Sequence, residues 1–351
     1  MIHFLSFYVI LKMPIHEGSK MLKTTLSALA ITVSTLAMAQ EPNYQAPEQA
    51  TATDFIEIFE TLSGKHPGIR KGHARGVCAA GSFTPSSVAQ ERYSSPIFDT
   101  KVPVVLRFSM GGGNPNADER AKAPRGIGVQ FQLANGSLHQ LAGLTTPMFA
   151  GKNPEQFLGL LRLNAQIRDG EAPADARANY FAANPEAAGQ GQWLQQRNPA
   201  AEYTSASYYG IHTFFADTAT GKKDKFRWQL IPATGEVLLT DEERETLPAD
   251  FLTDRLVERI NTDGAVHYYL QWVIGTDADA TNDPSVVWPV EQREVVNVGT
   301  LTISGANGEQ CTPINFDPNL LAQGVQASDD PVLALRSAAY AISFGKRLSQ
   351  Q

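Results

Sequence analysis

Apolar side chains recur every three or four residues along several stretches of the chain, which is the spacing of an amphipathic helix. The first stretch covers residues 54–62. Three later stretches follow, at residues 154–163, 182–197 and 240–261. Pro248 interrupts the third of these. The final stretch begins with Pro331, which suits the first position of a helix, so Asp330 is the predicted N-cap.

Short apolar runs bounded by turn residues lie between these stretches and predict β-strands. The first four cover residues 76–83, 102–110, 126–133 and 137–142. The others cover residues 208–217, 225–232, 265–274 and 295–303. Asn135-Gly136 and Thr220-Gly221 indicate tight turns between consecutive strands. About eight strands in neighbouring hairpins, with helices at both ends of the sequence, predict an α+β fold built on an antiparallel barrel or meander.

Residues 1–39 have the pattern of a secretory signal peptide. Met21-Leu22-Lys23 is a short basic start, an apolar run follows, and Ala37-Met38-Ala39 is a small-residue cleavage site. The apolar run is too short to span a membrane. We interpret residues 1–20 as translation from a start codon chosen too early, with a genuine extension as the alternative. The mature protein is therefore expected in the periplasm, or secreted, with residues 40–53 as a flexible lead-in and no membrane span.

Composition and cysteine content narrow the function further. The formal net charge of -7 argues against a nucleic acid or an anionic membrane as partner. No motif of a nucleotide-binding protein, zinc protease or serine hydrolase is present, and no C-x-x-C-H motif for covalent haem attachment. Cys78 and Cys311 could pair in an oxidising compartment, but a domain of this size needs no disulfide, so we expect them unpaired.

The last predicted helix carries an unusual face. Arg336, Tyr340, Phe344 and Arg347 follow one another at steps of four, four and three, so they share one side of the helix. Nearby positive charge favours the ionised form of a tyrosine, and a phenolate is a ligand for ferric haem iron. The alternative, from this helix alone, is an amphipathic closing helix with a buried tyrosine and solvated arginines.

A second cluster lies nearer the start of the chain. His73 stands where a loop meets a predicted strand, and the small residues after it leave space over its ring. On the next strand Arg107 and Ser109 share one face, by the period of two. The alternative is a surface histidine, or a structural one with its hydrogen bonds satisfied.

Taken together, these segments resemble the haem catalases, and most of all the short, exported catalase-related peroxidases. The resemblance runs in order from about residue 55 to residue 348. The matching segments are Arg70-x-x-His73-Ala74-Arg75-Gly76, Arg107-Phe108-Ser109, residues 123–131, residues 145–149, residues 209–214, Val287-Trp288-Pro289, Val298-Gly299-x-Leu301 and Arg336-x-x-x-Tyr340 with Arg347. The resemblance implies one haem-binding domain over residues 54–351. Its fold would be an eight-stranded antiparallel barrel with flanking helices and no C-terminal flavodoxin-like or long helical domain.

The resemblance also implies a cofactor, non-covalent haem b (iron protoporphyrin IX), with Tyr340 as the axial iron ligand. Arg336 would stabilise the phenolate, and Asp330 and His212 occupy the positions that hold this arginine in the family. The remaining arginines of the pattern match residues that pair with the haem propionates. They are Arg70, Arg107 and Arg347.

On the opposite side of the haem, His73 is implied as the acid–base residue, with Ser109 orienting it. Phe157 matches an aromatic residue that packs on this distal face. Thr145 stands where the family has an asparagine that helps to position peroxide, and Gly72 stands where it usually has valine. The chain ends eleven residues after Tyr340, without the region that carries NADPH binding and much of the tetramer interface in larger relatives.

We therefore expect a haem peroxidase that reduces hydrogen peroxide or organic hydroperoxides, with a small molecule or a protein as external electron donor. The changed distal position at Thr145 predicts weak disproportionation of peroxide. Two alternatives stay open: a fatty-acid hydroperoxide isomerase or lyase on the same barrel, and a non-catalytic haem-binding protein. The expected assembly is a monomer or a small homo-oligomer.

Overall fold

The computed structural model describes residues 49–351, so the predicted signal peptide and residues 40–48 of the predicted lead-in lie outside the described part. The first helix, α1 (Ala52–Ser63), begins two residues before the predicted start at residue 54. Its beginning is fixed by a capping box, in which the Thr51 hydroxyl accepts a hydrogen bond from the Asp54 amide (3.3 Å) and the Asp54 carboxylate accepts one from the Thr51 amide (3.0 Å). The last two residues of the predicted lead-in therefore belong to the helix.

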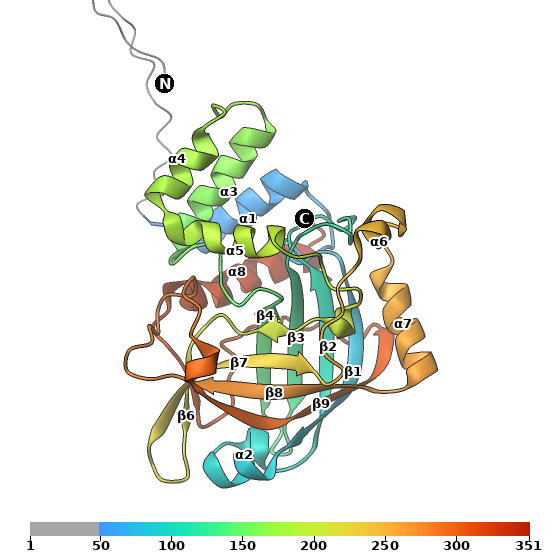
Figure 1. Ribbon diagram of the computed structural model, residues 1–351, viewed down its shortest axis with the longest axis vertical. Coiled ribbons are helices and arrows are strands. Elements are labelled where there is room, and N and C mark those ends of the chain that lie inside the picture. Colours follow the sequence, from blue (N-terminus) through green and yellow to red (C-terminus); the bar gives the residue numbers. More distant parts are fainter. Residues whose placement is uncertain (1–48) are drawn as a thin grey trace, which may run out of the picture. The chain divides into compact units, whose positions relative to one another are not determined.

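Eight antiparallel strands close into a barrel in the order β7-β5-β4-β3-β2-β1-β9-β8, and pairing of β7 with β8 completes the ring (Figure 1). Their bounds are β1 Gly76–Pro85, β2 Val102–Met110, β3 Arg125–Gln132, β4 Leu138–Leu144, β5 Tyr208–Tyr209, β7 Lys223–Pro232, β8 Val266–Ile274 and β9 Glu294–Gly308. Two short strands, β6 (Phe214–Asp217) and β10 (Val325–Ala327), extend the sheet beyond β7. The predicted antiparallel eight-stranded barrel is confirmed.

Side chains alternate between the two faces of each strand, so the barrel has an apolar interior and an outer face with polar and charged residues. On β2 the side chains of Leu106 and Phe108 are fully buried in the main core. Arg107 and Ser109 therefore point to the other face of the same strand. Burying each large apolar side chain contributes about 2 kcal/mol, so the filled interior stabilises the barrel while leaving its outside free for polar groups.

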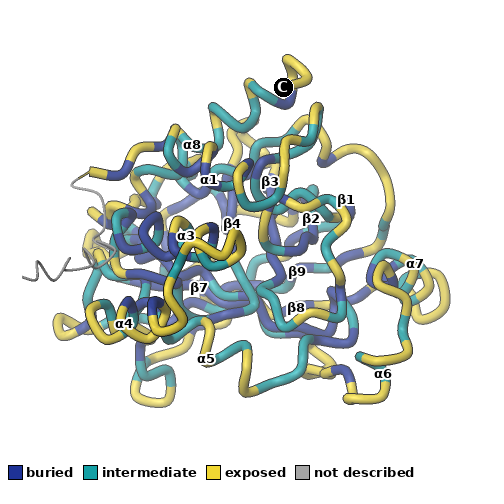
Figure 2. Tube along the Cα trace, turned by 90° about the horizontal axis from the view of Figure 1, so that it is seen from above, coloured by how far each residue is buried: buried dark blue, intermediate teal, exposed yellow. Residues whose placement is uncertain are grey.

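Helices flank the barrel, and the described residues hold none with the combined length and apolar character of a membrane span. Their bounds are α2 Ser87–Arg92, α3 Pro154–Arg168, α4 Ala176–Ala183, α5 Gly189–Gln195, α6 Asp241–Thr246, α7 Leu252–Asp263 and α8 Pro331–Leu348. α1, α3 and α8 pack against one another (Figure 1). Buried segments run mainly through the barrel strands, whereas α4, α6 and α7 carry long exposed stretches (Figure 2).

The structure divides two elements that the sequence pattern joined. The predicted helix over residues 182–197 is interrupted at Pro185, where α4 ends and a 3-10 turn leads into α5. Proline lacks an amide donor and pushes Asn184 out of the helical region, to φ -134° and ψ 67°. The predicted strand over residues 208–217 is likewise divided into β5 and β6, and the break between them carries His212.

Cys78 and Cys311 form a disulfide, so the expectation that they are unpaired was wrong. Their Cα atoms lie 5.3 Å apart although 233 residues separate them in sequence. The reason is the sheet register: β1 pairs with β9, with Cys78 opposite Gly308. A cysteine three residues beyond Gly308 is therefore brought next to Cys78.

A buried charged cluster joins α1, the loop before β1 and the end of α8. The Glu60 carboxylate lies 3.2 Å from the Lys71 ammonium and 2.7 Å from that of Lys346. Lys71 is 3% exposed and also donates a 2.5 Å hydrogen bond to the carbonyl of Gln351. Because water is excluded from Lys71 and Glu60, each charge depends on its partners. The cluster therefore fastens α8 to the loop that leads to His73.

We predict that Glu60→Ala lowers the free energy of unfolding by about 3 kcal/mol, because it leaves the buried Lys71 charge without its carboxylate. Denaturant unfolding followed by circular dichroism measures this. The matched control is Asp169→Ala, which removes the exposed pair with Arg168 and is expected to leave the free energy of unfolding nearly unchanged. Equal losses for the two variants would contradict the stabilising role of the cluster.

Candidate active site

Four side chains form a hydrogen-bonded relay that ends on Tyr340. Arg336, one turn before Tyr340 on α8, donates a hydrogen bond to the tyrosine oxygen. The other arm of Arg336 lies 3.0 Å from Nε2 of His212, and Nδ1 of His212 lies 2.6 Å from the Asp330 carboxylate. Asp330 also caps α8, accepting hydrogen bonds from the Val332 and Leu333 amides, as the sequence predicted. One residue therefore both begins the helix and orients its arginine.

The histidine of this relay is neutral. Burial lowers the pKa of His212 to about 4, and the nearby Arg336 adds to this although Asp330 opposes it. A neutral ring that gives its Nδ1 proton to Asp330 presents a lone pair at Nε2, which accepts from Arg336. The guanidinium is thereby directed at Tyr340, and the hydrogen bond to the tyrosine oxygen comes from a charged donor.

His73 and Ser109 form a second pair, His73 in the loop before β1 and Ser109 on the outer face of β2. Nδ1 of His73 lies 3.0 Å from the Ser109 hydroxyl, which in turn donates to the Gly126 carbonyl at 3.4 Å. This chain assigns the imidazole proton to Nδ1 and leaves the Nε2 lone pair as a base. A side chain at Gly126 would place its Cβ 2.6 Å from the His73 ring, so only glycine fits there.

The His73 imidazole is held in an unusual conformation and in its neutral form. Its backbone has φ 52°, in the left-handed region that non-glycine residues rarely adopt and that is often found at functional sites. Burial, together with the charges of Arg107, Arg336 and Arg70, lowers the pKa of His73 to about 4. The ring lies deep within the protein yet keeps an accessible side. Because Arg336 of the first relay acts on His73, the two clusters share one electrostatic environment.

Three arginines gather at this site without any carboxylate partner among residues 49–351. Arg107 donates to the carbonyls of His73 (2.8 Å) and Ala74 (3.0 Å). Burial, with the charges of Arg107 and Arg347, lowers the pKa of Arg70 to about 9, and burial is the main cause that lowers the pKa of Arg107 to about 10. Keeping several guanidinium groups together and away from water costs free energy when no anion is present. The three arginines therefore suit a ligand that carries carboxylates.

Two predicted site residues have other contacts in the structure. The Thr145 hydroxyl accepts a 3.0 Å hydrogen bond from the Arg125 amide, which leaves its proton free to donate. The Phe157 ring lies between Phe55 and Phe149, at 5.7 and 4.5 Å between centroids. No hydrogen bond or ring contact among the described residues joins Thr145 or Phe157 to His73, so their roles stay predictions.

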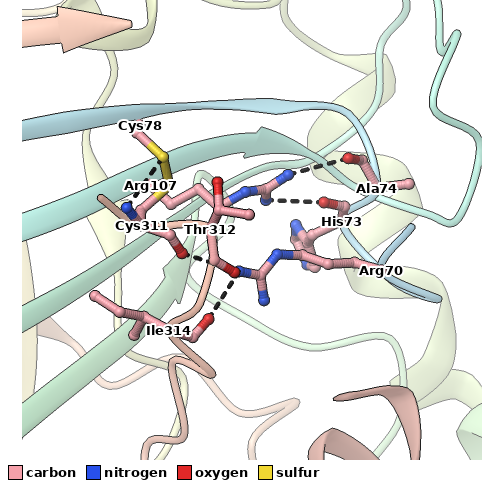
Figure 3. Close-up of a disulfide and its surroundings, with 8 residues drawn as sticks. All are labelled: Arg70, His73, Ala74, Cys78, Arg107, Cys311, Thr312 and Ile314. Carbon is pink, nitrogen blue, oxygen red and sulfur yellow. Dashed lines mark hydrogen bonds between the residues drawn. A yellow bond between two sulfur atoms is a disulfide. The ribbon is translucent and has the colours of Figure 1, made fainter. Parts of the chain in front are cut away.

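The sequence reasoning missed one wall of the site, the loop at residues 311–314. Its carbonyls accept hydrogen bonds from Arg70, and the disulfide ties it to β1 (Figure 3). The cysteines were a signal for this loop, but their distance in sequence concealed the contact. The need for glycine at position 126 also went unrecognised, since it depends on the neighbouring strand.

Known proteins are similar to this chain in sequence. A family model described as catalase matches residues 36–351. A catalase-related peroxidase of Synechococcus elongatus is 37% identical over 85% of this chain and 88% of its own length. A catalase-related peroxidase of Mycolicibacterium paratuberculosis is 32% identical over 86% of this chain and 94% of its own length.

Solved structures agree in fold. A fungal catalase superposes with a TM-score of 0.71 at 24% identity, covering 81% of this chain and 60% of that protein. A bacterial catalase gives a TM-score of 0.70 at 21% identity, covering 93% of this chain and 68% of that protein. With the family model matching all of the described residues, and relatives above 30% identity over most of their length, the chain belongs to the catalase family.

Proposed function

We propose that this protein is a haem-dependent peroxidase that reduces hydrogen peroxide or organic hydroperoxides with electrons from an external donor. One observation carries the proposal: a neutral histidine base, His73, shares its environment with a tyrosine whose oxygen receives a hydrogen bond from an arginine. Membership of the catalase family supports it, as do the two relatives named catalase-related peroxidases.

The residues present fit haem b held without a covalent bond. Tyr340 would supply a phenolate to the iron, with Arg336 stabilising its charge. Arg70, Arg107 and Arg347 would pair with the two propionates, which would offset the cost of keeping these cations away from water. When bound, the haem iron supplies the redox chemistry that splits the peroxide O–O bond.

Residues of the chain itself would transfer the proton of the peroxide. His73 takes the proton of the peroxide at Nε2 and returns it to the departing oxygen, which lets the O–O bond break heterolytically. Ser109 keeps the other ring proton on Nδ1, so the base faces the substrate throughout. A His73 pKa of about 4 keeps the ring unprotonated at any pH well above that value.

An external donor is favoured over disproportionation because of Thr145. This side chain offers one hydrogen-bond donor where the family's asparagine would offer two, and its oxygen is already engaged by Arg125. A second peroxide molecule is then poorly positioned to act as the reductant. A haem carrier would need neither His73 nor Ser109, so their contact favours catalysis over carriage.

We also propose that the protein is exported to the periplasm. The signal-peptide pattern of residues 21–39 is the main support. The disulfide between Cys78 and Cys311 agrees with it, because disulfides persist in oxidising compartments and are rare in the cytosol.

Replacing the proposed iron ligand tests the cofactor. We predict that Tyr340→Phe loses most of its haem, because the variant has no oxygen to bind iron. The haem-to-protein ratio and the absorption spectrum measure this after expression with haem. Tyr269→Phe, at an exposed tyrosine of β8, is the control and should keep full occupancy. Full occupancy with an unchanged spectrum in Tyr340→Phe would rule out the ligand role.

Removing the proposed base tests the chemistry. We predict that His73→Ala keeps its haem but reacts with peroxide about 10²–10⁴-fold more slowly, the usual contribution of a positioned acid–base group. For the unchanged protein, kcat/KM should fall as pH drops through about 4, because protonated His73 accepts no proton. Stopped-flow absorbance measures both. His267→Ala, at an exposed histidine, should react normally. An unchanged rate in His73→Ala would contradict the role.

The need for a donor separates the proposed peroxidase from its alternatives. We predict that hydrogen peroxide is consumed quickly only when an oxidisable phenol is added, with little oxygen evolved at an oxygen electrode. Rapid oxygen evolution without the phenol would instead indicate a true catalase. Rearrangement of a fatty-acid hydroperoxide without the phenol would indicate an isomerase or lyase.

A further inference from the structure

Arg70 is held by backbone carbonyls. Its Nη2 donates hydrogen bonds to the carbonyls of Cys311 (3.1 Å), Thr312 (3.3 Å) and Ile314 (2.7 Å), as Figure 3 shows. All three belong to the loop that follows β9, which we name the carbonyl loop (residues 311–314). Among the described residues the guanidinium has no carboxylate to replace them, so the carbonyl loop decides where this charge lies.

The carbonyl loop is itself tied to the barrel by a covalent bond. Cys311, one of the three acceptors, is joined to Cys78 on β1, and its amide also lies 3.2 Å from the Cys78 sulfur. Cys78 stands directly opposite Arg107 in the pairing of β1 with β2. The disulfide therefore connects the strand pair that carries Arg107 with the loop that holds Arg70.

Arg70 and Arg107 repel each other, and burial makes the repulsion stronger. The lowered pKa of Arg70 has burial as its main cause and Arg107 as the next. Three aligned carbonyl dipoles offset this cost only while the carbonyl loop stays in place. Apart from the disulfide, the segment is fastened by Phe316, whose ring fills the space over Gly128, so a cut disulfide would loosen the loop rather than free it.

We propose that the disulfide between Cys78 and Cys311 is a positioning element for haem retention. The disulfide holds the carbonyl loop in place, and the carbonyls of this loop orient Arg70. Arg70 in turn pairs with the haem propionates. This rests on the proposed function, since it takes the haem propionates as the ligand of Arg70. The competing explanation is general stabilisation of the fold by a long-range crosslink, which would not act through Arg70.

The test measures haem loss from the ferric holoprotein to an excess of apomyoglobin, followed by absorbance. Removing the disulfide with Cys78→Ala/Cys311→Ala should accelerate haem loss about tenfold, the order expected for one charge-assisted hydrogen bond, or about 1.4 kcal/mol. The same double substitution in an Arg70→Gln background should change the rate by less than about twofold, because the disulfide acts through Arg70 and the two effects are therefore not additive.

Arg347→Gln supplies the matched control. Arg347 is a third cation of the site, but it lies on α8 and stacks on Phe344 rather than on the carbonyl loop. Disulfide removal in this background should still accelerate haem loss about tenfold. Equal acceleration in the Arg70→Gln and Arg347→Gln backgrounds would overturn the proposal, as would an unchanged rate in the otherwise unaltered protein.

Reduction of the disulfide gives the same comparison if the cysteine variant does not fold. Dithiothreitol breaks the S–S bond by supplying two electrons and two protons and closes to its own cyclic disulfide; it is then removed under anaerobic conditions. Thermal unfolding recorded beside the kinetics reveals any general loss of stability. Retention of haem by Tyr340→Phe would count against the proposed function. An effect of disulfide removal on haem loss that is the same with and without Arg70 would overturn this inference alone.

Discussion

The hydrogen bond from Arg336 to Tyr340 is the interaction on which the rest of the site depends. Both side chains are partly shielded from water, and a hydrogen bond from a charged donor is stronger than one between neutral groups. The relay through His212 to Asp330 keeps the arginine directed at the tyrosine oxygen. Because Asp330 is also the N-cap of α8, the residue that begins the helix also helps to orient the arginine on it.

Positive charges of the site also act on His73. Arg107, Arg336 and Arg70 add to burial in lowering the pKa of His73, which keeps its imidazole neutral. The arginine that donates to Tyr340 thus also helps to keep His73 a free base. Arg336 contacts Tyr340 and also acts on His73, so losing this arginine would affect both side chains.

Contacts between segments far apart in the sequence hold the side chains of the site in position. The barrel holds Ser109 and Gly126 on neighbouring strands, where they orient His73. The Glu60 cluster fastens α8 to the loop before β1, so the helix with Tyr340 cannot move away from the histidine independently. The disulfide keeps the carbonyl loop within hydrogen-bonding distance of Arg70.

The sequence by itself determined most elements whose signals are local: the strands other than the divided one at residues 208–217, the start of α8 at Asp330, and the shared face of Arg336 and Tyr340. Period, capping and helical spacing involve near neighbours. Tertiary structure alone decided the pairing of Cys78 with a cysteine 233 residues away. It also decided the need for glycine at position 126 and the partner of the Thr145 hydroxyl. These contacts follow from how strands align across the sheet, and that register depends on many residues at once.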